Sequence, residues 1–236
     1  MGAPAKVWSP WAEAEEFERW WHAGPPLDEP AGERSETAGA VVREDRRLCR
    51  WKGRAYWLER CIEPSRPTWR HPFGWPAAQH ERQVTRALEA AGIGVAPLLY
   101  SGAQRQGDDW RSVTVREVQP AFSGLGTWFE RWDEEDTAAP LRRELAVTLC
   151  RLHLLGWHHP ALAPALIRAR LREGESGRWA ELTLGGLRHV RRCGDPGLAF
   201  RLDFEALRRD AGQWPAGEVE RLAAAYRDAL EQADPR

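Results

Sequence analysis

Apolar residues recur at helical spacing near the start of the chain. Phe17, Trp20 and Trp21 form one apolar side of residues 11–22, and glutamates fill the first turns. This pattern predicts an amphipathic helix. Residues 24–37 are rich in Gly, Pro, Glu and Ser, a composition that predicts a loop.

The next part of the chain has the alternating pattern of strands, interrupted by one helix. The helix is expected at residues 77–91, where apolar residues recur at i, i+3, i+4 and i+7, and Gly92 ends it. Lys52 and Gly53 predict a tight turn between two strands. The expected strands are residues 39–43, 48–51, 54–61, 95–102 and 111–119, with a polar loop at residues 104–109 before the last.

From about Pro120 the pattern becomes mainly helical. Residues 141–155 predict a strongly amphipathic helix, because their leucines repeat on one side. The remaining expected elements are helices at 124–132, 202–211 and 217–232, an acidic loop at 133–139, and short strands at 165–170 and 179–184.

This order predicts an α+β protein with two lobes. The expected parts are an N-terminal helix and loop at residues 1–37, a sheet-rich lobe at 38–119 and a helical lobe at 120–236.

Composition and charge exclude several classes of protein. The 34 Lys and Arg residues nearly balance the 35 Asp and Glu residues, for a net charge of -1, so a general nucleic-acid binder is not expected. No apolar run is long enough to span a membrane, and the first ten residues lack the core of a signal peptide. We therefore expect a cytoplasmic protein. Four widely spaced cysteines, expected to be reduced and structural, are Cys49, Cys61, Cys150 and Cys193.

Several strings, in a consistent order, are similar to one known family. They lie at residues 17–21, 69–74, 81–93, 152–159 and 201–209. Together they resemble the lipopolysaccharide kinase family, and most closely its bacterial InaA-like branch. The resemblance implies a bilobal protein-kinase-like fold, with a small antiparallel-sheet N-lobe that carries one inserted helix, and a mainly helical C-lobe.

The resemblance also places the residues of phosphoryl transfer, and the first of them is altered. Glu59 stands where a phosphate-binding lysine belongs, and a carboxylate would repel phosphates. The helix carboxylate that normally pairs with this lysine is present as Glu81, which would face Glu59 as a like charge unless an arginine intervenes. Arg60 is adjacent, but strand alternation directs it to the opposite face of the sheet.

The catalytic loop implied by the resemblance lacks its chemistry. His159 and Leu162 match the pattern, but Ala161 stands at the position of the base and Leu166 at that of a metal ligand. Gly185 stands where the second metal aspartate belongs. None of these three side chains can accept a proton or bind Mg²⁺.

Two aspartates leave alternatives open. Asp195 either contributes to a metal site or begins an ordinary Asp-Pro-Gly turn. Asp203 either resembles the family's anchoring aspartate, bonded to the loop of His159, or caps the helix at 202–211. The weak nucleotide-binding candidates are Arg60, Glu81 and Asp195.

Three further groups of residues could bind ligands. His153, His158 and His159 favour structural roles over metal binding. Tryptophans in the 64–76 segment would mark a docking surface if they are exposed. Seven arginines would form a patch for phosphorylated sugars, anionic lipid headgroups or an acidic partner if they converge: Arg168, Arg170, Arg172, Arg178, Arg188, Arg191 and Arg192.

These residues favour a catalytically inactive family member, a pseudokinase. The resemblance implies a scaffold or regulator in bacterial envelope or stress biology, with no cofactor and no metal. It implies a protein partner, such as an active kinase or an envelope-biogenesis enzyme, and a place in the cytoplasm or at the periphery of the inner membrane. The alternatives are an ATP- and Mg-dependent kinase of a lipopolysaccharide core sugar in a different register, a kinase-fold nucleotide enzyme with non-standard carboxylates, and a plain α+β binding module.

Overall fold

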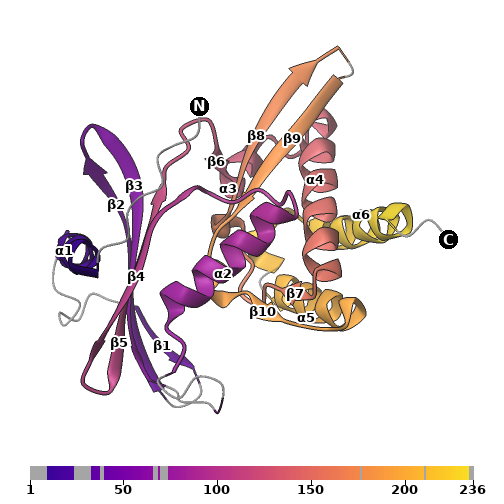
Figure 1. The fold of residues 1–236 in the computed structure, drawn as a ribbon. Helices are drawn as coiled ribbons and strands as arrows, with labels where there is room; N and C mark the ends of the chain where they lie inside the picture. The colour runs from indigo at the N-terminus through magenta and orange to yellow at the C-terminus, as the bar shows by residue number, and fades with distance from the viewer. Residues whose placement is uncertain are drawn as a thin grey trace. The chain divides into compact units, whose positions relative to one another are not determined.

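The computed structural model describes residues 10–23, 33–37, 40–65, 69, 74–175, 177–209 and 211–233. The chain forms two compact units, whose helices and strands are labelled in Figure 1. The first comprises residues 1–82 and 97–118, and the second comprises residues 83–96 and 119–236. Helix α2 (Ala77–Ala90) contributes to both.

A five-stranded antiparallel sheet, in the order β1-β2-β3-β5-β4, forms the first unit. The turn between β2 and β3 is the predicted one, since Lys52 and Gly53 have φ values of 49° and 77°, as a two-residue hairpin requires. The strands are β1 (Glu33–Thr37), β2 (Ala40–Trp51), β3 (Arg54–Pro64), β4 (Leu98–Gln106) and β5 (Asp109–Glu117).

The two faces of this sheet differ in character. One face is apolar and packs against helix α1 (Pro10–Trp21), as Figure 1 shows. The other face is polar and carries the contacts to α2. The apolar cluster comprises Phe17, Trp20, Trp21, Tyr56, Leu58, Val113 and Val115.

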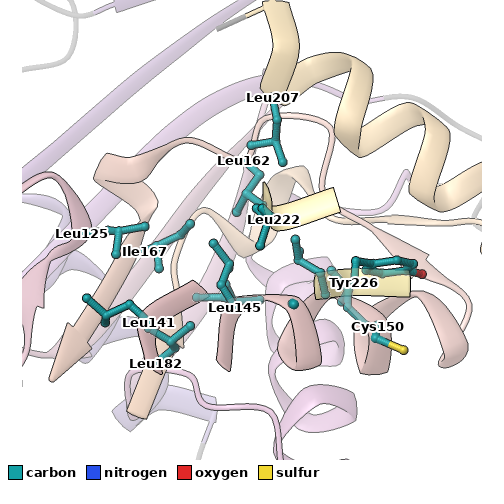
Figure 2. Packing of buried hydrophobic residues seen from close by; sticks show 14 of the residues in the cluster. Leu125, Leu141, Leu145, Cys150, Leu162, Ile167, Leu182, Leu207, Leu222 and Tyr226 are labelled. Atoms are coloured by element: carbon teal, nitrogen blue, oxygen red, sulfur yellow. The ribbon is translucent and has the colours of Figure 1, made fainter. Parts of the chain in front are cut away.

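The second unit is mainly helical, and its core lies around α4 (Figure 2). Leucines of α4 pack with Ile167, Leu182, Leu207, Leu222 and Tyr226. The elements of this unit are β6 (Ser123–Gly124), α3 (Leu125–Trp128), η1 (Phe129–Arg131), α4 (Glu135–Leu154), β7 (Trp157–His158), η2 (Pro164–Leu166), β8 (Ile167–Gly174), β9 (Gly177–Leu184), η3 (Leu187–His189), β10 (Arg191–Arg192), α5 (Pro196–Arg209), η4 (Ala211–Gln213) and α6 (Glu218–Ala233).

Several predicted boundaries in the first unit are wrong. Part of the predicted loop at 24–37 is strand β1, and the two strands predicted at 39–43 and 48–51 are the single strand β2. The polar loop predicted at 104–109 shrinks to a turn at Gly107 and Asp108. In each case the segment is too polar to be predicted as a strand. It becomes one because its backbone pairs with a neighbouring strand.

The second unit also departs from the prediction at helix starts. The predicted acidic loop at 133–139 mostly belongs to α4, which begins at Glu135, because carboxylates stabilise the first turn of a helix. Helix α5 begins at Pro196, six residues earlier than expected, so Asp203 lies in its interior. Of the two alternatives left open for Asp203, the helix cap is therefore excluded. All four cysteines are free, as predicted.

Gly94 is a position where even a methyl group does not fit. A Cβ atom there would overlap the carbonyl oxygen of Leu182, and the Gly94 carbonyl accepts a hydrogen bond from Leu184 N–H at 3.0 Å. We expect Gly94→Ala to lower the free energy of unfolding by about 1–3 kcal/mol, measured by urea denaturation. The control is Gly126→Ala in α3, where the added Cβ has open space and should not destabilise.

Candidate functional site

Glu59, on the polar face of the sheet, is paired with an arginine of the neighbouring strand. Glu59 is 6% exposed, and its Oε1 lies 3.1 Å from Nε of Arg46 in β2. The Arg46 guanidinium also lies over the Trp57 ring, 4.8 Å from its centroid. The position of the implied lysine therefore holds a carboxylate that a cation already neutralises.

Glu81 of α2 makes a second ion pair on the same face. Nε and Nη2 of Arg116 donate to its Oε1 at 3.0 and 2.8 Å, and the Thr114 hydroxyl donates to Oε2 at 3.3 Å. Both charged side chains are buried. Each of the two glutamates thus has its own arginine, which resolves the like-charge conflict that the sequence raised.

In the second unit, Asp203 and His159 join three segments of chain. The backbone N–H of His159 donates to Oδ2 of Asp203 at 2.7 Å. The His159 Nε2–H donates to the carbonyl of Gly185 at 2.9 Å, so this ring nitrogen carries the proton. Burial lowers the pKa of His159, which keeps its imidazole neutral. These bonds tie the loop after β7 both to α5 and to the end of β9.

Two more histidines complete the surroundings of Asp203. Nε2 of His153 lies 3.0 Å from Oδ2, and Nδ1 of His158 lies 3.1 Å from Oδ1. The Tyr226 hydroxyl lies 2.9 Å from Nδ1 of His153, and burial raises the pKa of that hydroxyl. The fully buried carboxylate is therefore surrounded by donors, which makes it a structural hub.

None of the positions of the implied base and metal ligands carries a polar side chain. Ala161 is exposed and presents only a methyl group. The Gly185 N–H donates to the carbonyl of Leu166 at 2.7 Å, so the two implied ligand positions are bonded through their backbones. A Cβ on Gly186 would lie 2.9 Å from Cδ1 of Leu166, so the leucine side chain packs against Gly186.

Comparisons with known proteins decide the family. The model of the lipopolysaccharide kinase (Kdo/WaaP) family matches residues 18–226. The chain belongs to this family. It is 24% identical over 221 residues to Protein InaA of Escherichia coli (strain K12), an alignment that covers 91% of this chain and 97% of InaA.

A solved structure confirms the predicted fold. The structure titled "WaaP in complex with acyl carrier protein" aligns with a TM-score of 0.50 and 18% identity, over 93% of this chain and 98% of that one. The chain therefore has the kinase-like α+β fold of its family, with an antiparallel-sheet N-lobe and a helical C-lobe.

The remaining nucleotide-binding candidates of the kinase pattern lie in different places. Arg60 is on the α1 face, where Nη1 donates to the Trp21 carbonyl at 2.6 Å and Nη2 to Asp45 at 2.7 Å. Asp195 is exposed at the start of α5, where Oδ1 accepts the N–H of Gly197 at 2.8 Å. Asp195 thus begins the ordinary Asp-Pro-Gly turn, where its side chain caps helix α5.

The arginines of the β8–β9 hairpin lie on both of its faces and pair with carboxylates. Arg170 and Arg172 both contact Glu181, whereas Arg178 pairs with Glu173 on the opposite face of the hairpin. Cross-strand carboxylates therefore neutralise much of this charge. Strand alternation places Arg178 on the face of the hairpin opposite Arg170 and Arg172, so these three arginines do not share one surface.

Two tryptophans predicted to mark a docking surface are exposed. Trp69 is 87% exposed and Trp75 is 41% exposed. The other residues at 66–68 and 70–73 lie outside the described part of the chain.

Elsewhere in the described ranges, no group of three His, Cys, Asp or Glu side chains could hold a metal ion, and no helix is long and apolar enough to cross a membrane.

Sequence reasoning missed Arg46, Arg116 and Tyr226. Strand alternation could have found Arg116. It lies two residues after Thr114, so both side chains are on the same face of the strand. The partners of Arg46 and Tyr226 depend on strand register and helix packing, which cannot be predicted from local sequence patterns.

Proposed function

We propose that this chain is a catalytically inactive member of its family, a pseudokinase that acts as a scaffold or regulator. The contact between Leu166 and Gly185 carries this proposal. Magnesium in phosphoryl transfer needs oxygen ligands, and these two positions offer a hydrocarbon side chain and no side chain. The position of the base is Ala161, whose methyl group cannot accept the hydroxyl proton.

The ion pairs of the N-lobe support the same proposal. A kinase N-lobe needs a cation that can meet the nucleotide phosphates. Here Glu59 adds a negative charge, and Arg46 and Arg116 are each engaged by a glutamate. A triphosphate would have to displace a carboxylate from one of these arginines, at a cost in buried ion pairs.

The residues that match the family pattern support a framework role. Glu81, His159 and Asp203 are all buried, and the hydrogen bonds described above connect them to strands, loops and helices of the protein. Such a chain keeps the family's shape while the chemistry is lost. A protein partner fits this role, and for the relative WaaP the solved structure holds acyl carrier protein. The proposed setting, bacterial envelope or stress biology, is that of the family.

The alternative is a nucleotide enzyme with non-standard carboxylates, and its candidates are poorly placed. Asp203 is bonded to three histidine residues, and Glu81 is held by Arg116 and Thr114. Asp195 alone is exposed. It would have to coordinate a metal while it caps α5.

Thermal unfolding with and without about 1 mM ATP and Mg²⁺ tests the proposal. A ligand with a dissociation constant near 10 µM would stabilise the fold by about 2.7 kcal/mol. That would raise the midpoint by about 5–10 °C in a domain of this size. We expect no magnesium-dependent rise, because the metal positions lack ligands.

Asp195→Ala serves as the matched variant for this measurement. A magnesium-dependent rise of the midpoint that Asp195→Ala abolishes would replace the pseudokinase proposal by the alternative enzyme. A magnesium-dependent rise that survives in the variant would equally overturn it, in favour of a kinase in another register.

A further inference from the structure

The turn between β2 and β3 concentrates positive charge. Residues 46–58 read Arg-Arg-Leu-Cys-Arg-Trp-Lys-Gly-Arg-Ala-Tyr-Trp-Leu, so they include five basic side chains and no acidic one. The first two arginines pair with carboxylates of the same sheet. The other three cations, Arg50, Lys52 and Arg54, lie in the turn or beside it. Figure 1 shows this turn at one end of the sheet of the first unit.

Most of the charge at this turn is not neutralised within the described part of the chain. Arg50 and Lys52 are exposed, and neither contacts a carboxylate there. Arg54 lies 3.7 Å from Glu117, but its side chain is 72% exposed, and such a surface pair is weak. The turn therefore presents a positive field to the solvent.

Two large apolar side chains lie among these cations. Leu48 is 54% exposed and Trp51 is 38% exposed. The Trp51 ring contacts the Trp20 ring of α1, with centroids 5.6 Å apart, and Nζ of Lys52 lies 4.4 Å from the Trp51 centroid. The indole is therefore held in place while part of it faces the solvent. Exposed tryptophan beside basic residues is typical of surfaces that lie at the headgroup layer of a membrane.

Strand alternation distributes these residues over both faces of the hairpin. Leu48 and Arg50 lie on the polar face of the sheet, and Trp51 and Arg54 lie opposite each other on the face that packs against α1. Lys52 is at the apex, where its φ of 49° forms the two-residue turn. The end of the hairpin is thus both basic and apolar on its two faces and at its apex.

This distribution favours a bilayer over a protein as the partner. A protein surface covers one face of a hairpin, whereas the headgroup layer of a bilayer surrounds a hairpin that enters it end first. We propose that the end of the β2–β3 hairpin binds the surface of an anionic lipid bilayer. Its cations would meet lipid phosphates, and its two apolar side chains would reach the boundary with the acyl chains. This inference does not depend on whether the chain is catalytically inactive.

Co-sedimentation of the full chain with lipid vesicles tests the proposal. The anionic vesicles contain equal parts of phosphatidylcholine and phosphatidylglycerol, and the neutral vesicles contain phosphatidylcholine alone. At low ionic strength we expect a partition coefficient at least about tenfold larger for the anionic vesicles. Most of this difference should disappear in about 0.5 M salt, because salt screens exposed charges.

Variants at the turn locate the binding. Arg50→Gln and Lys52→Asn each remove one charge, and the second keeps the turn because Asn-Gly is a favoured hairpin sequence. Each should weaken binding to the anionic vesicles about fivefold, the effect of one basic side chain near the surface. Leu48→Thr keeps every charge and should weaken binding about threefold or more, because less apolar surface leaves the water.

Arg105→Gln is the matched control. Arg105 is an exposed arginine beside the β4–β5 turn, which lies at the other end of the same sheet. Its loss changes the net charge as much as Arg50→Gln does, yet binding should stay within about twofold of that of the unmodified protein. All four substituted side chains are exposed, so the variants are expected to fold, and their thermal midpoints check this.

Four results would overturn the proposal. Equal binding to anionic and neutral vesicles, or equal weakening by Arg105→Gln and Arg50→Gln, would remove the turn as the site. Unchanged binding of Leu48→Thr would exclude insertion. Soluble poly-L-glutamate that binds as tightly as the vesicles, at the same concentration of negative charge, would indicate an acidic polypeptide as the partner. The ATP experiment contains no vesicles, so its result does not bear on this proposal.

Discussion

Asp203→Ala is expected to lower the free energy of unfolding by about 3–5 kcal/mol, which corresponds to about 6–20 °C in the thermal midpoint. The carboxylate is fully buried and accepts bonds from His153, His158 and the backbone of His159. Without it, two buried donors and one partly buried donor lose their acceptor. Circular dichroism during heating and during urea denaturation measures the effect.

Two controls distinguish the loss of the buried, hydrogen-bonded Asp203 carboxylate from the loss of a negative charge alone. Asp195→Ala removes an exposed carboxylate that caps α5, and should cost about 1 kcal/mol. Asp203→Asn keeps the size and one acceptor oxygen, and should fall between the two alanine variants. If Asp203→Ala were as mild as Asp195→Ala, the hub would not organise the C-lobe.

The buried pair of Glu81 and Arg116 should be strongly coupled in a double-mutant cycle. Glu81→Gln and Arg116→Met should each cost about 3–5 kcal/mol, because each leaves a buried charge without its partner. The double variant should cost clearly less than the sum, with a coupling energy of about 1–3 kcal/mol. Urea denaturation of the four proteins gives the cycle.

An exposed pair in the same protein provides the comparison. Arg131 and Glu134 lie 2.7 Å apart on the surface, and Arg131→Ala should cause no measurable change in stability. Additive effects of Glu81→Gln and Arg116→Met would mean that the pair does not hold α2 to the sheet. The role of Arg116 as the cation for Glu81 would then be wrong.

The sequence predicted the order of elements well where local patterns are strong. Helices α1, α2 and α6 were placed to within a residue or two, because their apolar residues repeat at helical spacing. Strand β2 was divided in two because residues 43–47 are all charged. In the folded chain Asp45 and Arg46 pair across the sheet, with Arg60 and Glu59, so long-range contacts stabilise a locally unfavourable strand.

The candidate site was predictable as a set of positions, but its electrostatics were not. The resemblance located Glu59, Glu81 and Asp203, whereas the cations that neutralise the glutamates lie on other strands. Burial would raise the pKa of Asp45, yet bonds from Arg47 and Arg60 outweigh it and lower the pKa. The balance between burial and hydrogen bonding that sets such a pKa depends on strand register and on how deeply the side chain is buried. Neither can be predicted from the pattern of residues along the chain.

The packing of α1 bears on how this chain should be divided for study. The family match begins at Glu18, in the middle of this helix. A chain trimmed to that boundary would lose Phe17, which stacks on Trp21 and contacts the apolar face of the sheet. The exposed remainder would be prone to aggregation. The folding boundary of the N-lobe thus lies before the boundary that similarity alone defines.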